Sequence, residues 1–192
     1  MKNALLIIDM QNDFVLPGAP LHVAGAAATI PVIKKLLELA RSRNWERIHI
    51  IRQHRRDGSD TESWRVSLFT KGPGVCVPGT DGARIVEELT PTADEHIIAK
   101  CRFSAFFQTS LDLLLRRLGV QNVIITGTQY PNCVRGTAVD AMSLDYRTIV
   151  VTDACSAQTE EIALSNIRDM RNMGITCITA AELEPLLEQQ NG

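Results

Sequence analysis

The sequence predicts an α/β fold in which helices cover both faces of a parallel β-sheet. Short apolar runs rich in β-branched residues alternate along the chain with longer stretches whose apolar residues recur at helical spacing. The short runs are apolar at nearly every position rather than at every second one, as strands buried on both faces require. Together these observations indicate a three-layer α/β/α sandwich built on a six-stranded sheet.

The strands are predicted from the short β-branched runs, which leave room for a helix between each pair. In chain order they are Ala4–Ile8, Arg47–Ile51, His96–Ala99, Asn122–Thr126, Thr148–Val151 and Thr176–Ile178.

Helical periodicity predicts the connecting elements and a closing helix. These are Ile30–Arg43, Gly82–Leu89, Ser110–Leu118, Cys133–Leu144, Glu160–Met173 and Ala181–Gln189. Gly119 and Gly174 follow two of them, as helix C-termini favour, and Thr80 and Thr159 are available as N-caps. Only His54–Gly79 breaks the alternation. It is long, irregular and rich in Arg, Asp, Ser and Gly, so we interpret it as a functional loop.

Composition limits the class of protein. A chain of 192 residues with 45% hydrophobic content can bury one sizeable core, and nothing in residues 1–192 suggests a linker, so a single domain is predicted. The net charge of −2 offers no basic surface for nucleic acid. Met1 to Asn3 lead directly into a strand, and no apolar stretch approaches the roughly 20 residues needed to span a membrane. We therefore expect a cytoplasmic protein whose partner is a small molecule.

Three chemically complementary residues follow predicted strands. Asp9 comes after the first, Lys100 after the third, and Cys133 stands where the fourth gives way to a helix. The carboxyl ends of parallel strands share one edge of the sheet, where ligands bind in doubly wound folds. A helix N-terminus favours a thiolate and offers donors to an oxyanion. A carboxylate, an ammonium and a thiol at this edge predict an acid/base-assisted cysteine site.

Each of the three also has a plain structural interpretation. In isolation Cys133 is a small buried hydrophobe, Asp9 a cap and Lys100 a surface charge, and only their combination favours catalysis. The other cysteines lack such a context and are interpreted as reduced packing residues, because five cysteines without a CxxC pair suit neither a disulfide framework nor a zinc ribbon. They are Cys76, Cys101, Cys155 and Cys177.

Four ordered motifs carry a family resemblance over nearly the whole chain. They are Leu6–Phe14 (LIIDMQNDF), Val77–Gly82 (VPGTDG), Lys100–Phe106 (KCRFSAF) and Gly127–Arg135 (GTQYPNCVR). With these motifs the chain resembles the isochorismatase-like cysteine hydrolases, which include nicotinamidases, carbamoylsarcosine amidases and ureidoacrylate hydrolases. The resemblance implies a sheet of order 3-2-1-4-5-6 and an Asp-Lys-Cys triad, which maps onto Asp9, Lys100 and Cys133.

The expected chemistry follows from these residue types. Asp9 takes the proton of the Cys133 thiol and returns it to the leaving amine, while Lys100 keeps Asp9 ionised and stabilises negative charge. Water then hydrolyses the thioester. The resemblance further implies a cis peptide bond between Thr128 and Gln129, which points the amides of Gln129 and Cys133 into one oxyanion hole. Pocket walls are expected from the loops that follow the strands and from the long loop. The candidates are Phe14, Trp64, Phe106, Gln129 and Tyr130.

Metal binding is not expected. The nicotinamidase branch holds a divalent ion with an Asp and two His after the second strand, but this chain has Ile51–Asp57 there, with one His among three arginines. Guanidinium groups repel a dication. Arg52, Arg55 or Arg56 either meets a carboxylate-bearing substrate or forms a solvated loop face. No cofactor is implied.

The sequence therefore predicts a metal-independent hydrolase that cleaves a C–N bond in a small amide, ureido or carbamoyl compound through a Cys133 thioester. One alternative is isochorismatase-type vinyl-ether hydrolysis, which can use Asp9 without a cysteine nucleophile. Another is a binding or redox-sensing protein that uses the same thiol. Apolar residues beyond one stripe in Leu111–Leu115, together with the family resemblance, predict a homo-oligomer, either a dimer or a tetramer.

Overall fold

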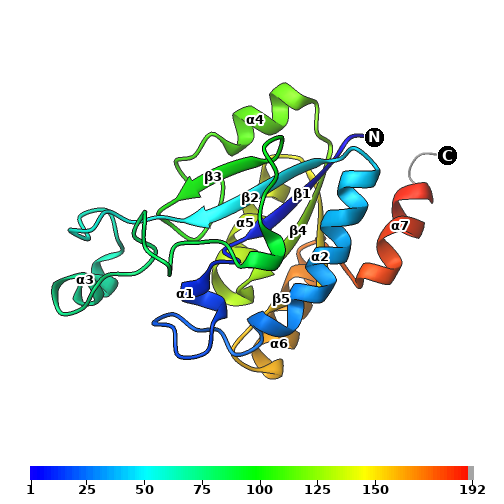
Figure 1. Ribbon diagram of the computed structural model, residues 1–192. Helices are drawn as coiled ribbons and strands as arrows, with labels where there is room; N and C mark the ends of the chain where they lie inside the picture. The colour runs from blue at the N-terminus through cyan, green and yellow to red at the C-terminus, as the bar shows by residue number, and fades with distance from the viewer. Residues whose placement is uncertain (190–192) are drawn as a thin grey trace.

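The computed structural model describes residues 1–189, which form an α/β/α sandwich (Figure 1). The strands are β1 (Asn3–Ile8), β2 (Glu46–Arg52), β3 (His96–Lys100), β4 (Asn122–Thr128), β5 (Arg147–Ser156) and β6 (Thr176–Ile178). All neighbouring pairs are parallel, and the order is β3-β2-β1-β4-β5-β6. The predicted sheet, its order and all six strands are confirmed.

Helices cover both faces of the sheet, as the apolar strands require. The helices are α1 (Asn12–Val15), α2 (Ala26–Ser42), α3 (Ser67–Thr70), α4 (Leu111–Leu118), α5 (Arg135–Ser143), α6 (Glu160–Asn172) and α7 (Ala180–Gln189). Leu111, Ala138 and Met170 place α4, α5 and α6 in one core cluster, while Ile33 and Leu183 place α2 and α7 in the other. β1 lies in the middle of the sheet and is buried at every position.

Two helix ends have the capping residues predicted from the sequence. The Thr159 hydroxyl accepts a hydrogen bond from the Ile162 amide at the start of α6, and Gly119 has a left-handed conformation (φ 70°) at the end of α4. The helix predicted from Cys133 begins instead with a π turn at Tyr130–Val134, so Cys133 lies within the first turn.

The helix predicted at Gly82–Leu89 is wrong, because only a 3₁₀ turn at Glu87–Leu89 forms there. The backbone before this turn pairs with the loop after β1 instead. Gly82 O accepts a hydrogen bond from the Asp13 amide, and Gln11 pairs with Ile85 in an isolated antiparallel bridge. These bonds replace the helical ones.

The long loop contains only two short helical pieces, a 3₁₀ turn at Ser63–Arg65 and α3. In Figure 1 it lies beyond the ends of β2 and β3, at the side of the molecule where those strands finish. No helix within the described residues is long and apolar enough to cross a membrane.

Candidate active site

Asp9 and Lys100 form a buried ion pair at the carboxyl edge of the sheet. Lys100 Nζ donates to Asp9 Oδ2 at 2.7 Å, and both side chains are fully shielded from solvent. Asp9 has a left-handed backbone (φ 51°) as the chain leaves β1, and its amide bonds to Ile50 O. Asp9 Oδ1 is buried and accepts no hydrogen bond from any described residue. One carboxylate oxygen is therefore held by the ammonium, and the other remains available.

The Cys133 thiol lies against this pair and is only 4% exposed. Burial first, and then the negative charge of Asp9, raises the pKa of Cys133, whereas Lys100 and Arg52 act in the opposite direction. The structure thus brings together the three residues predicted from the strand ends. Burial and the charge of Asp9 outweigh the nearby cations in the resting protein, and the contribution of the helix N-terminus stays a prediction.

Arg52, at the end of β2, also faces the thiol. Its guanidinium is fully buried, and Nη2 donates to Cys133 Sγ at 3.6 Å. Nη1 donates to Glu62 Oε1 at 2.8 Å and to Cys101 O at 3.0 Å. Burial opposes the charged form, but Cys133, Asp9 and Glu62 together keep the pKa of Arg52 above its ordinary value. From the sequence, Arg52 was one of three equal candidates; the structure distinguishes it.

A second guanidinium, that of Arg65, completes this part of the site. It comes from the 3₁₀ turn of the long loop, is 5% exposed, and shares Glu62 with Arg52 through an Nη1–Oε2 distance of 3.4 Å. Its guanidinium stacks on Trp64 at 4.5 Å and on Phe103 at 5.6 Å. Sequence reasoning missed Arg65 and Glu62, because nothing in an irregular loop indicates which side chains turn inward.

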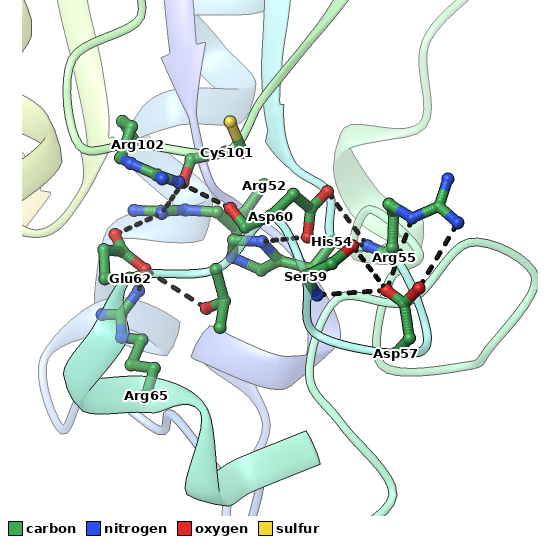
Figure 2. Close-up of polar contacts among 11 residues, drawn as sticks. Arg52, His54, Arg55, Asp57, Ser59, Asp60, Glu62, Arg65, Cys101 and Arg102 are labelled. Carbon is green, nitrogen blue, oxygen red and sulfur yellow. Dashed lines mark hydrogen bonds and ion pairs between the residues drawn. The ribbon is translucent and has the colours of Figure 1, made fainter. Parts of the chain in front are cut away.

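The remaining arginines of the loop turn away. Figure 2 shows Arg55 directed toward Asp57, away from Arg52 and Glu62. The Arg55 side chain is 69% exposed, and Arg56 is also exposed. The interpretation as a solvated loop face therefore describes Arg55 and Arg56, but not Arg52.

Three of the predicted wall residues make contacts in the core. Phe14 packs in the core between the sheet and α2, the face opposite to that of Cys133. Tyr130 is buried with its hydroxyl donating to Thr152 O, and Phe106 stacks on Tyr146 at 6.0 Å. Their aromatic rings are used in the core, where they bury the most apolar surface.

Gln129 follows β4 directly, and Trp64 stacks on Arg65. The predicted cis peptide bond between Thr128 and Gln129 is present. Trp64 is 65% exposed, whereas Arg65, which stacks on its ring, is 5% exposed. A hollow of about 330 Å³ adjoins Glu62, and its other lining residues are Arg102, Phe103, Ser104, Phe107 and Asp140. Asp9, Lys100 and Cys133 are not among its lining residues.

The side chains after β2 do not suit a metal ion. The guanidinium of Arg52 occupies the start of this segment, and His54 has its Nδ1 3.4 Å from Asp60 and its ring against Phe69. Burial and the charge of Arg52 lower the pKa of His54, which leaves a neutral ring beside a fixed cation. No group of three His, Cys, Asp or Glu side chains in residues 1–189 could hold a metal. The donor set therefore does not fit the dication of the nicotinamidase branch.

The chain has clear relatives over most of its length. A probable inactive nicotinamidase of Arabidopsis thaliana is 43% identical over 184 residues, which cover 94% of each chain. A maleamate amidohydrolase of Pseudomonas putida is 35% identical and covers 88% of this chain and 79% of its own. A ureidoacrylate amidohydrolase of Agrobacterium fabrum is 30% identical and covers 80% and 75%.

Solved structures agree with the sequence relatives. An isochorismatase family protein from Desulfovibrio vulgaris superposes with a TM-score of 0.96 at 57% identity and covers 97% of this chain and 98% of its own. A pyrazinamidase of Pyrococcus horikoshii in complex with zinc gives 0.82 at 28% identity, covering 93% and 99%. The isochorismatase domain profile matches residues 3–182. This chain is therefore a member of the isochorismatase family.

Proposed function

We propose that this protein is a cysteine amidohydrolase that cleaves the C–N bond of a small amide, ureido or carbamoyl compound through a thioester on Cys133. The observation that carries the proposal is the buried Asp9–Lys100 pair beside the buried thiol. Burying two charges costs several kcal/mol per ion unless they are well paired, so such a pair against a nucleophile favours a functional role. The relatives named maleamate and ureidoacrylate amidohydrolase support the same reaction class.

The first half of the reaction uses Asp9 as the base. Asp9 takes the thiol proton as Cys133 Sγ attacks the carbonyl carbon, and the carbonyl π electrons move to oxygen. Lys100 and Arg52 favour the developing thiolate, since both lower the pKa of Cys133. The backbone N–H groups of Gln129 and Cys133 are the proposed oxyanion donors. The C–N bond then breaks, and Asp9 gives its proton to the leaving amine.

The second half regenerates the thiol. Water attacks the thioester carbonyl while Asp9 accepts a proton from it, and the C–S bond breaks as the oxyanion collapses. The sulfur then recovers a proton from Asp9. One amide and one water thus become one carboxylic acid and one amine. No step requires a metal ion, and the Arg52 guanidinium would repel one from the end of β2.

The test compares the protein with its Cys133→Ala variant on maleamate, ureidoacrylate, nicotinamide and isochorismate. Release of ammonia, measured with and without a chelator, is expected only from the intact thiol and is expected to be unaffected by the chelator. Pyruvate from isochorismate that persists in Cys133→Ala would instead support vinyl-ether hydrolysis. Alkylation of Cys133 without any turnover on a broader amide panel would favour the redox or binding alternative.

A further inference from the structure

The charges around Cys133 do not balance. Three buried cations gather there, namely Arg52, Arg65 and Lys100. The carboxylates that pair with them are Asp9, bound to Lys100, and Glu62, shared by both guanidiniums. The thiol supplies no charge at neutral pH, because its pKa is raised. The site as described is therefore short of one anion.

The two guanidiniums also have unused donors. Arg52 Nε and Arg65 Nε are buried and have no hydrogen-bond partner among residues 1–189. An unpaired buried donor is costly, and more so when it is charged, so such groups indicate a missing acceptor. A guanidinium presents its donors as a planar fork that matches a carboxylate. The geometry around Glu62 illustrates this, since one carboxylate already reaches both cations (Figure 2).

We infer that Arg52 and Arg65 bind the carboxylate of an anionic substrate, and that Glu62 occupies its place in the resting protein. This inference rests on the proposed function and names its substrate class: an acid that also carries an amide or ureido group. Arg52 touches Cys133 Sγ, so the substrate carboxylate lies close to the attacked carbonyl. In short molecules such as maleamate and ureidoacrylate, the carboxylate likewise lies close to the amide or ureido carbonyl.

Glu62 has somewhere to go when substrate binds. Its side chain lines the 330 Å³ hollow, which Arg102 also lines, so a displaced Glu62 carboxylate can face solvent and a second arginine. Phe103 lies under both guanidiniums, at 5.5 Å from Arg52 and 5.6 Å from Arg65, and keeps them in place during the exchange. Because Glu62 moves only as far as the adjoining hollow, the substrate carboxylate adds the anion that the site lacks.

The first experiment uses the unmodified protein. Maleamate and ureidoacrylate are compared with their methyl esters, which keep the amide or ureido group and remove the charge. We expect kcat/KM for each acid to exceed that of its ester by about 100-fold or more, as for other buried charge pairs. Esters that are hydrolysed as well as the acids overturn the inference and leave the proposed hydrolase intact. A panel on which nothing is hydrolysed contradicts the proposed function instead.

Variants test which arginines bind the substrate carboxylate. Arg52→Met and Arg65→Met are expected to remove most of the preference for the acid, and Arg52→Lys to retain part of it. Arg55→Met is the matched control, because it removes an exposed arginine of the same loop whose side chain pairs with Asp57. Loss of the preference in Arg55→Met, with retention in Arg52→Met and Arg65→Met, would place carboxylate binding on the loop surface and refute the assignment.

A further variant avoids dependence on folding of the arginine mutants. Glu62→Gln removes the resident charge, so in a Cys133→Ala background calorimetry is expected to show tighter binding of maleamate and unchanged binding of its methyl ester. Weaker binding of maleamate in Glu62→Gln contradicts the placeholder role of Glu62. Circular dichroism on each variant separates loss of fold from loss of binding.

Discussion

The environment of Cys133 separates two roles of Asp9. Its charge raises the pKa of the thiol, whereas Lys100 and Arg52 lower it. Asp9→Asn therefore lowers the pKa of Cys133 but removes the group that protonates the leaving amine. We expect amide hydrolysis to fall by about two to four powers of ten, while alkylation of Cys133 by iodoacetamide at pH 7 becomes faster.

Peptide mapping by mass spectrometry measures this alkylation. Cys101, which is partly exposed, serves as the internal standard in each sample, and Cys133→Ala identifies the peptide. In the unmodified protein Cys133 is expected to react more slowly than Cys101, because burial raises the pKa of Cys133 and limits access. Slower alkylation in Asp9→Asn would mean that the loss of the base outweighs the lower pKa of Cys133, and would contradict the expected dominance of the pKa effect.

At the level of elements, Glu95 joins α2, β2 and β3. Arg41 Nε of α2 donates to Glu95 Oε1 at 2.7 Å, and His49 Nε2 of β2 lies 2.9 Å from Oε2. Glu95→Gln leaves Arg41 without its charge partner, so we expect the free energy of unfolding at pH 7 to fall by about 2–4 kcal/mol. Urea unfolding measures the change, and Glu88→Gln, at an exposed position nearby, is the control.

The Glu95 carboxylate also predicts how stability changes in acid. Burial alone would raise the pKa of Glu95, but hydrogen bonds from Arg41, His49 and the Thr92 amide lower it to about 2. The folded pKa lies below the ordinary value of 4.5, so this stabilisation is present above pH 4.5 and is lost as the pH falls toward 2. The difference in the free energy of unfolding between the unmodified protein and Glu95→Gln is thus expected to narrow below pH 4.5. A difference that widens there would contradict the assignment.

The end of β4 depends on a glycine. Gly127 has φ 109°, and a Cβ there would lie 2.1 Å from Ile8 O of the neighbouring β1. Gly127→Ala must push apart two central strands, so we expect a loss of more than about 4 kcal/mol or no folded protein. Gly119 also has a positive φ (70°), but a Cβ there would meet nothing within 4 Å. Gly119→Ala is therefore expected to cost only about 1–2 kcal/mol. Equal melting temperatures of the two variants would refute this distinction.

Across the whole molecule, the sequence predicted what local pattern and strand order determine. β-Branched runs located all six strands, and residues directly after strands, such as Asp9 and Lys100, were placed correctly because the sheet edge fixes them. The helix predicted at Gly82–Leu89 was wrong because a distant segment, Gln11 to Asp13, forms backbone hydrogen bonds with these residues. Glu62 and Arg65 were missed because they lie in an irregular loop, where no periodic pattern indicates which side chains pair with Arg52 and with each other.

The outer surface beside β3 carries the last prediction, that the protein self-associates. β3 ends the sheet, and Ile97 on it is 55% exposed, while Leu113 on α4 is 73% exposed. Both border one hollow with Ile98 and Leu114, so their exposure is contiguous rather than scattered. Adjacent exposed apolar side chains of this kind favour an interface, and a second copy satisfies both at once.

Sedimentation equilibrium tests this directly against the chain mass of 21.2 kDa. We expect a mass corresponding to a dimer or tetramer, and expect Leu113→Lys to shift it toward the monomer, because a lysine placed in an apolar contact must lose its hydration. Leu164→Lys is the control, since Leu164 is 58% exposed on α6, away from this hollow. A monomer in the unmodified protein would exclude self-association at that concentration, and an oligomer that dissociates only in Leu164→Lys would move the interface to α6.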